Sequence, residues 1–178
     1  VKDLNGDGLI DDEDKTILGD PYPDLVWSLT NDFKFGPVDF SFMFQGSHGA
    51  EVRNMADQYI FNHFNSSQDF ISTTPDQGFI KQKIFTNSII QDASYVALRT
   101  INIGYTFPSS FTDKSKIDTL RLYATGQNLM YLTADNYTGF NPESIYHQSG
   151  SQLSTTYGYQ RGGSPINQTI SIGLNVQF

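Results

Sequence analysis

The chain of 178 residues contains no cysteine, which excludes disulfide bonds and thiolate metal ligands. It also lacks any apolar run near the roughly 18 residues that a membrane-spanning helix requires. Basic residues are scarce, with 11 against 19 acidic ones, and the net charge of −8 argues against nucleic acid or anionic lipid headgroups as the main partner. The chain begins on Val1 without a charged-then-apolar leader, as expected of a mature or cleaved product or of a fragment.

The last thirteen residues, 166–178, alternate between apolar and polar side chains and end on an aromatic residue. A period of two predicts a β-strand with one apolar and one polar face. In a soluble sandwich the apolar face would be buried, whereas in a transmembrane β-barrel it would contact lipid. The aromatic content of 14%, in an otherwise polar chain, suits a lipid-facing barrel with aromatic girdles or a carbohydrate-binding surface.

Four other segments alternate in the same way, so that the expected strands cover about residues 24–35, 38–46, 94–107, 117–130 and 166–178. The Gly36-Pro37 turn predicts a hairpin between the first two. Long and short connections also alternate, as in outer-membrane barrels, which have long outer loops and short periplasmic turns. Five strands cannot close such a barrel. The pattern predicts an all-β fold: the C-terminal five strands of a large antiparallel transmembrane β-barrel with long extracellular loops and a periplasmic C-terminus.

The alternation also predicts which side chains contact lipid and which face the interior of the barrel. The lipid-facing set consists of Trp27, Leu29, Phe33, Phe40, Phe42, Ile101, Ile103, Leu122, Ile170, Ile172, Leu174 and Val176. The opposite face is expected to carry Ser28, Ser41, Asn102 and Ser171. Burial of the first set against protein would instead favour the soluble sandwich.

Arg99 is the one charge on the apolar face predicted for the strand over 94–107, a face that also includes Tyr95 and Ala97. Because Arg99 follows a long loop closely, we expect it at the outer-leaflet boundary, where a charge costs roughly 0–1 kcal/mol. Lipid phosphates there would suit a guanidinium. The alternative is a β-bulge near Ala97 that turns Arg99 into the lumen and places Leu98 outside.

Residues 3–14 fit the twelve-position EF-hand loop in ligand order. Gly8 stands at the position of the sharp turn. The ligands would be the carbonyl of Leu9 and the side chains of Asp3, Asn5, Asp7, Asp11 and Asp14. Closely spaced oxygen atoms suit a hard cation, so this loop predicts a structural Ca²⁺ site within an extracellular loop over residues 1–23. The alternative is an acidic turn that holds no ion.

No motif indicates an enzyme. His48, His63 and His147 lack metal-ligand spacing, and neither a G-x-S-x-G nor an H-E-x-x-H motif occurs. A glycosidase would need two carboxylates at a defined separation, and no spacing singles out such a pair. Residues 51–64 have a pattern compatible with a helix. Six aromatic residues near the last long loop suit ligand stacking or loop packing equally: Tyr131, Tyr137, Phe140, Tyr146, Tyr157 and Tyr159.

Several motifs occur together and in order along the chain. D-x-N-G-D-G-x-I-D over 3–11 precedes G-D-P-x-P over 19–23, and D-A-S-Y-V-A-L-R-T-I-N-I-G-Y begins at Asp92. They are followed by R-L-Y-A-T-G-Q-N-L over 121–129, G-F-N-P-E over 139–143 and the final aromatic strand. Over essentially the whole chain these motifs resemble the C-terminal region of the SusC/RagA-type TonB-dependent outer-membrane transporters.

The resemblance implies that residues 24–178 are the C-terminal part of a barrel of about 22 strands, in the outer membrane of a Gram-negative bacterium. It further implies an N-terminal plug, energy coupling through TonB, and a SusD-like surface lipoprotein that acts as a lid in the import of glycans or peptides. The expected function is nutrient import without bond chemistry. The alternative is a soluble, calcium-dependent carbohydrate-binding β-sandwich module.

Overall fold

The computed structural model describes residues 2–9, 11–54, 70–71, 79–80, 87–112, 116–144, 157–160 and 164–178. The chain divides into two compact units. Unit 1 comprises residues 1–22, 50–93 and 136–164, and unit 2 comprises residues 23–49, 94–135 and 165–178. None of the described helices has the length and apolarity needed to cross a membrane.

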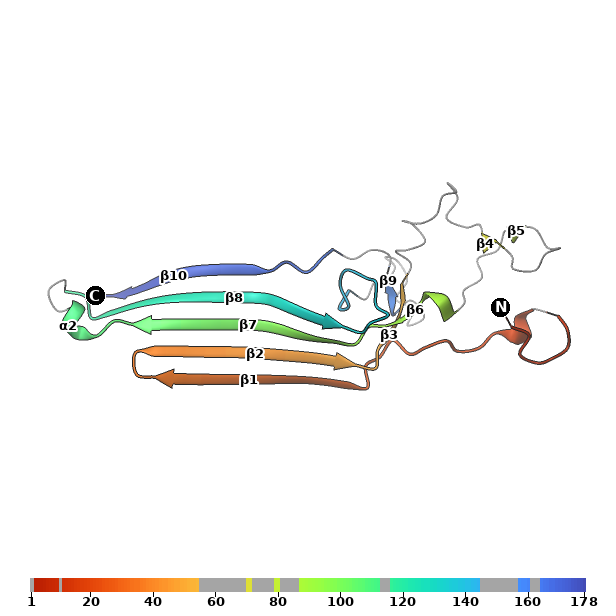
Figure 1. Ribbon diagram of the computed structural model, residues 1–178, viewed down its shortest axis with the longest axis horizontal. Coiled ribbons are helices and arrows are strands. Elements are labelled where there is room, and N and C mark those ends of the chain that lie inside the picture. The colour runs from red at the N-terminus through yellow and green to blue at the C-terminus, as the bar shows by residue number, and fades with distance from the viewer. Residues whose placement is uncertain are drawn as a thin grey trace. The chain divides into compact units, whose positions relative to one another are not determined.

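Unit 2 contains one antiparallel sheet of five strands, shown in Figure 1. In sheet order they are β1 (Leu25–Phe35), β2 (Val38–His48), β7 (Tyr95–Thr106), β8 (Thr119–Thr133) and β10 (Thr169–Gln177). Every strand that the alternation predicted is present, with ends at most three residues from the expected ones. Within the described residues β1 and β10 each have a single neighbour, so the sheet is open at both edges.

Short connections gather at one end of this sheet. Gly36 adopts a φ of +58°, which glycine tolerates without a steric penalty, and with Pro37 it joins β1 to β2. The β7–β8 connection contains the single-turn helix α2 (Ser109–Thr112). Figure 1 shows the β1–β2 turn, α2 and the C-terminus at the same end of the sheet, which we call the short-turn end.

The ladders of β7 are interrupted at Arg99. On the β2 side, Leu98 opposes Phe44 and Thr100 opposes Met43, so Arg99 has no partner across the ladder. On the β8 side the register also shifts between Leu98 and Thr100. This is a β-bulge, in which an extra residue changes the face to which the neighbouring side chains point.

Unit 1 has a small sheet in the order β6 (Ile90–Asp92), β3 (Glu51–Asn54) and β9 (Tyr159–Gln160). The helix that we expected over 51–64 is therefore wrong for 51–54, and residues 55–64 lie outside the described part. A second pair comprises β4 (Phe70–Ile71) and β5 (Phe79–Ile80), and two 3₁₀ helices are η1 (Asp12–Asp14) and η2 (Asn87–Ile89). Val52, Ala93 and Tyr137 form the buried apolar cluster of this unit.

Candidate functional site

The five-stranded sheet has two chemically different faces. Directly opposed residues of antiparallel strands point to the same face. One such row runs through Phe33, Phe40, Ile103, Ala124 and Ile172. The registers place all twelve residues predicted to contact lipid on the same side, which we call the apolar face. Its side chains are open to the surroundings rather than buried, and Ile172 is 77% exposed.

Aromatic rings give the apolar face much of its area. Phe33 packs against Phe40 and Phe42 at centroid separations of 6.2 and 6.1 Å. Trp27 lies over Gly46, where any Cβ would meet its ring, and is stacked with His48 at 6.4 Å. His48 therefore has a packing role here, while His63 and His147 lie outside the described residues.

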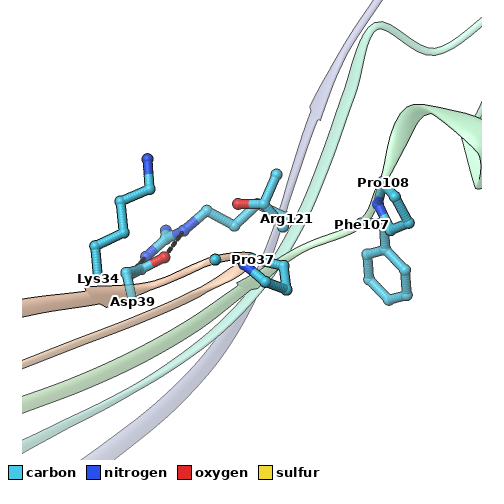
Figure 2. Close-up of a pocket in the computed structure, with 8 residues that line it drawn as sticks. Lys34, Pro37, Asp39, Phe107, Pro108 and Arg121 are labelled. Atoms are coloured by element: carbon cyan, nitrogen blue, oxygen red, sulfur yellow. Dashed lines mark hydrogen bonds and ion pairs between the residues drawn. The ribbon is translucent and has the colours of Figure 1, made fainter.

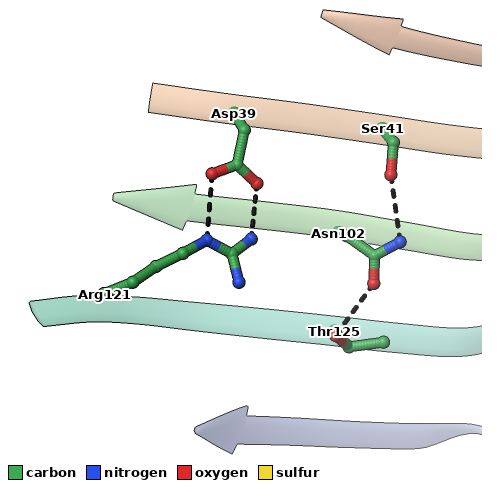
Figure 3. A network of polar contacts seen from close by, with 5 residues as sticks. All are labelled: Asp39, Ser41, Asn102, Arg121 and Thr125. Carbon is green, nitrogen blue, oxygen red and sulfur yellow. Dashed lines mark hydrogen bonds and ion pairs between the residues drawn. The ribbon is translucent and has the colours of Figure 1, made fainter. Parts of the chain in front are cut away.

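The opposite side, which we call the polar face, is tied together by side-chain hydrogen bonds. Asn102 donates to the hydroxyl of Ser41 at 3.0 Å, and the hydroxyl of Thr125 donates to Asn102 at 2.8 Å, as Figure 3 shows. Ser28 and Ser171 also lie on this face by register. The predicted division of side chains between the two faces is thus correct at these positions.

An ion pair on the polar face crosses an entire strand. The Arg121 guanidinium on β8 donates to both carboxylate oxygens of Asp39 on β2, at 3.1 and 2.5 Å. Between them lies Gly104 of β7, where a Cβ would collide with both groups. Figure 3 shows the pair passing over β7. The guanidinium also lies 5.2 Å from the centre of the Tyr123 ring, and that ring in turn covers Gly173 of β10.

A hollow of about 570 Å³ adjoins this ion pair at the short-turn end. The residues that line it are all drawn in Figure 2: Lys34, Gly36, Pro37, Asp39, Thr106, Phe107, Pro108 and Arg121. Asp39 is the one carboxylate in this lining, and Arg121 neutralises it. The hollow therefore lacks the paired carboxylates that glycoside hydrolysis uses.

Arg99 lies on the polar face, so our prediction of a lipid-interface position is wrong. Its Nε donates to the side-chain oxygen Oε1 of Gln45 at 2.7 Å, and Gln45 is on the polar face by register. Its Nη1 donates to the hydroxyl of Tyr131 and, at 3.4 Å, to Asn128, while Nη2 reaches the Tyr95 hydroxyl at 3.5 Å. The guanidinium lies 5.9 Å from the centre of the Tyr95 ring and 5.5 Å from that of Tyr131.

Because of the bulge, the predicted face is also wrong for two residues near Arg99. Ala97 opposes Gln45 and Tyr95 opposes Ser47, so both lie on the polar face rather than on the apolar face that strict alternation predicted. Both are buried there. Leu98 opposes Phe44 and takes the apolar face instead. One extra residue therefore reverses the faces to which residues 95–98 of β7 point.

The acidic loop over 3–14 is folded by hydrogen bonds from its own backbone. Asp3 accepts from the N–H groups of Gly6 and Gly8, at 2.5 and 2.8 Å, and Asp7 accepts from Leu9 at 2.8 Å. Gly8 has a φ of +86°, in agreement with the sharp turn expected at this position. The carboxylates thus meet backbone dipoles rather than one another.

At the end of this loop, Asp11 and Asp14 form a capping box around η1. The Asp14 carboxylate accepts from the N–H groups of Leu4 and Asp11, at 2.6 and 3.0 Å, and these bonds lower the pKa of Asp14. Lys15 likewise lowers the pKa of Asp12 through an ion pair of 2.7 Å. Among the residues that the structure describes, no three acidic or histidine side chains converge in a manner that could hold a metal ion.

The aromatic residues of the last long loop do not form one group. Tyr137 is buried in unit 1 and donates to Gln160 at 2.9 Å, and its burial raises its pKa. Tyr157 stacks on Tyr22 at 4.7 Å, and Arg53 lies over the ring of Tyr159 at 4.6 Å. These three rings therefore pack against other residues of unit 1, whereas Tyr146 lies outside the described residues.

Comparisons with known proteins agree with this two-faced sheet, although no family model matches the chain. The chain is 34% identical to TonB-dependent receptor P3 of Formosa agariphila, over 99% of this chain and 18% of that protein. It is 26% identical to TonB-dependent receptor SusC of Bacteroides thetaiotaomicron, over 99% and 17%. The solved RagAB peptide importer in its open-open state matches with a TM-score of 0.64 at 17% identity, over 88% of this chain and 17% of that one.

A sheet with an exposed apolar face and a hydrogen-bonded polar face has the construction of a β-barrel wall. The matches confirm the resemblance to the SusC/RagA-type TonB-dependent receptors, because over almost its whole length the chain is similar to one segment of these proteins. It spans less than one fifth of the length of the curated relatives, from 17% to 19%.

Proposed function

We propose that this chain forms part of the wall of an outer-membrane TonB-dependent importer of nutrients. The single observation that carries the proposal is the exposed apolar face, which unites all twelve predicted lipid-contacting residues on five adjacent strands. Strands of 9 to 15 residues are also long enough for a bilayer, which a tilted strand crosses with roughly 9–11 residues. The similarity to named TonB-dependent receptors over 99% of the chain supports the same function.

The partners that we propose follow from the relatives. The remaining barrel strands would pair with the open edges of β1 and β10, because unpaired backbone groups are costly in lipid. We further propose a plug domain, TonB, a SusD-like lipoprotein at the surface, and a periplasmic short-turn end. Glycans and peptides are both proposed as substrates: one relative is SusC and one solved structure is a peptide importer. The role of the chain would be binding and transport, without bond chemistry.

A pair of arginine substitutions on β10 tests the membrane function in the full-length receptor. Ile172→Arg places a charge on the apolar face and should cost about 2–4 kcal/mol if the residue lies near the bilayer midplane. Ser171→Arg is the matched control, since the neighbouring residue points to the polar face. The folded fraction recovered in outer membranes and the free energy of unfolding in lipid vesicles measure the difference. Equal losses for the two variants would contradict a lipid-contacting face.

We also propose that residues 3–14 bind a structural Ca²⁺ through Asp3, Asn5, Asp7, the Leu9 carbonyl, Asp11 and Asp14. The ligand order and the positive φ of Gly8 support this proposal. Calcium would replace part of the existing hydrogen bonds, since all four carboxylates of this set already accept backbone N–H groups. The ion would rigidify an outer loop.

Isothermal titration of the calcium-depleted receptor with CaCl₂ tests the ion site. The expected result is that the double variant Asp3→Asn/Asp7→Asn binds one Ca²⁺ fewer than the parent. Asp12→Asn is the matched control, because Asp12 lies in the same loop but pairs with Lys15 and is not a proposed ligand. Identical stoichiometry for all three proteins would contradict a site in this loop.

A further inference from the structure

The sequence contains one Asn-Gly dipeptide, Asn5-Gly6, and it lies in the acidic loop. Asparagine is among the chemically labile residues, because the backbone nitrogen of the following residue can attack its side-chain carbonyl carbon. Glycine in that following position obstructs the attack least, since it has no Cβ. Both residues are exposed to solvent. The dipeptide therefore has the composition and the access to water that spontaneous deamidation requires.

Deamidation of this dipeptide consumes water and releases ammonia, and it needs no other reactant. The Gly6 nitrogen loses its proton and forms a bond to Cγ of Asn5, while the bond from Cγ to Nδ2 breaks and ammonia leaves. Water then opens the resulting cyclic succinimide at either of its carbonyl carbons. Opening at Cγ leaves an aspartate, and opening at the backbone carbonyl carbon leaves an isoaspartate, whose main chain runs through the former side chain.

In the folded loop, the groups that must react are all engaged in hydrogen bonds. The Gly6 N–H donates to Oδ1 of Asp3 at 2.5 Å. Oδ1 of Asn5 accepts from the Asp7 N–H at 3.0 Å. Nδ2 of Asn5 donates to Asp7 at 3.2 Å and to Glu13 at 3.3 Å. Attack removes the Gly6 proton and moves both Oδ1 and Nδ2 as Cγ becomes tetrahedral, so it has to break hydrogen bonds that hold the loop.

Either product prevents the loop from returning to this structure. An aspartate at position 5 would replace the amide that donates to Asp7 with a second carboxylate at hydrogen-bond distance, and like charges repel. An isoaspartate would add a methylene to the main chain and shift the N–H groups of Gly6 and Gly8, both of which donate to Asp3. Deamidation therefore converts a transient opening of the loop into a permanent one.

We propose that Asn5-Gly6 is a spontaneous deamidation site that the folded loop protects, and that its modification opens the acidic loop irreversibly. The observation that carries this is the engagement of the attacking nitrogen, the carbonyl oxygen and the leaving amide in one set of hydrogen bonds. The chemistry depends neither on the proposed transport function nor on a bound ion.

Mass spectrometry of the aged full-length receptor measures the modification. Trypsin cleavage after Lys2 and Lys15 releases residues 3–15, and Asn5 is the one amide side chain in this peptide. The mass gain from amide to acid therefore identifies the site, and chromatography separates aspartate from isoaspartate. The receptor is incubated with a chelator at neutral pH, either folded in lipid vesicles or unfolded in urea. The folded receptor should deamidate several-fold more slowly than the unfolded one.

Two alanine variants test the protecting hydrogen bonds. Asp3→Ala removes the acceptor of the Gly6 N–H, so the folded variant should deamidate at a rate close to that of the unfolded receptor. Asp12→Ala is the matched control, because Asp12 lies in the same loop but pairs with Lys15. Its folded form should deamidate as slowly as the parent.

Amide hydrogen exchange of Asn5→Asp, which reproduces one product, tests the consequence of the modification. Protection of the Gly6 and Gly8 N–H groups should be several-fold lower in this variant than in the parent. The aged receptor should show the same loss in its deamidated fraction.

Each of the opposite results would overturn the proposal. Equal rates in the folded and the unfolded receptor would show that the loop gives no protection. A faster reaction in the folded receptor would show that Asp3 takes the Gly6 proton as a base instead of holding it. Equal folded rates for Asp3→Ala and the parent would show that the hydrogen bond to Asp3 does not protect the site. Parent-like protection of Gly6 and Gly8 in Asn5→Asp would show that the modified loop closes again.

Discussion

Arg99 and Arg121 both lie on the polar face, Arg121 by the regular alternation of β8 and Arg99 through the β-bulge in β7. For Arg121 the absence of a side chain at Gly104 leaves space for the guanidinium to reach Asp39 across β7. For Arg99 the bulge turns the side chain away from the apolar face. A charge on the opposite side would face an apolar medium in the proposed barrel, at a cost of about 2–4 kcal/mol near its centre.

Whether Arg99→Leu lowers or raises the free energy of unfolding shows on which face Arg99 lies. On the polar face, leucine removes the donor to Gln45 and Tyr131 and should destabilise the receptor by about 1–3 kcal/mol. On a lipid-facing surface the same change would be neutral or stabilising. Urea-induced unfolding in vesicles measures the free energy, with Arg99→Gln as a control that keeps a donor amide. A gain in stability for the leucine variant would contradict the assigned face.

The position of Arg99 shows the limit of alternation as a predictor. Period two assigns every second residue to one face, and it has no means to signal an inserted residue. The arginine itself was the available signal, because a charge on an apolar stripe indicates a local break in the period. The sequence could not predict the Asp39–Arg121 ion pair for another reason: the two residues are 82 apart, and the registers of three strands bring them together. A glycine inside a strand indicates a close approach of another group, and Gly104 and Gly173 were the sequence features that indicated one here.

Among the elements, the acidic loop carries a carboxylate whose pKa its own fold lowers. Because Asp14 accepts backbone N–H groups of Leu4 and Asp11, its pKa is lower when the loop is folded than when it is open. The ionised carboxylate therefore stabilises the loop at all pH values above its unfolded pKa of about 3.9. This stabilisation is lost as the pH falls through the lower, folded value.

We expect the loop to open on acidification before the sheet does. Hydrogen exchange of the receptor in chelator, expressed as protection factors for Leu4 and Asp11, should fall between pH 6 and pH 3. Asp14→Asn should already lack this protection at pH 6 and show little further change. Protection factors that are the same at both pH values in the parent protein would show that Asp14 does not hold the loop.

The five strands themselves were predictable because each carries a strong period of two, bounded by turn residues. The small elements of unit 1 were not, since β3, β6 and β9 have two to four residues each and show no measurable period. Their stability comes from distant polar contacts, such as the buried Asn54 donating to Gln91 at 2.9 Å. Such contacts join residues 37 apart in sequence and leave no local pattern. The sequence therefore predicted no strand in this unit, and it suggested a helix over 51–64 where β3 begins.

At the scale of the whole molecule, the open edges and the exposed apolar face predict how the isolated segment behaves. Produced alone, it should not remain a monomer in detergent-free buffer, because β1 and β10 offer unpaired backbone groups beside a large apolar surface. Size-exclusion chromatography with light scattering, with and without detergent, measures this. A stable monodisperse monomer in plain buffer would contradict the barrel segment and would favour the soluble β-sandwich.

The row of Lys34, Asp39, Gly104, Tyr123 and Gly173 has a geometric consequence for the interior of the proposed barrel. Two of its five positions have no side chain, and the neighbouring Asp39–Arg121 pair and the Tyr123 ring lie down over these positions. Side chains that would otherwise project toward the centre run parallel to the wall instead. At this level, near the short-turn end, the side chains of Asp39, Arg121 and Tyr123 therefore narrow the internal cross-section of the proposed barrel less than upright side chains would.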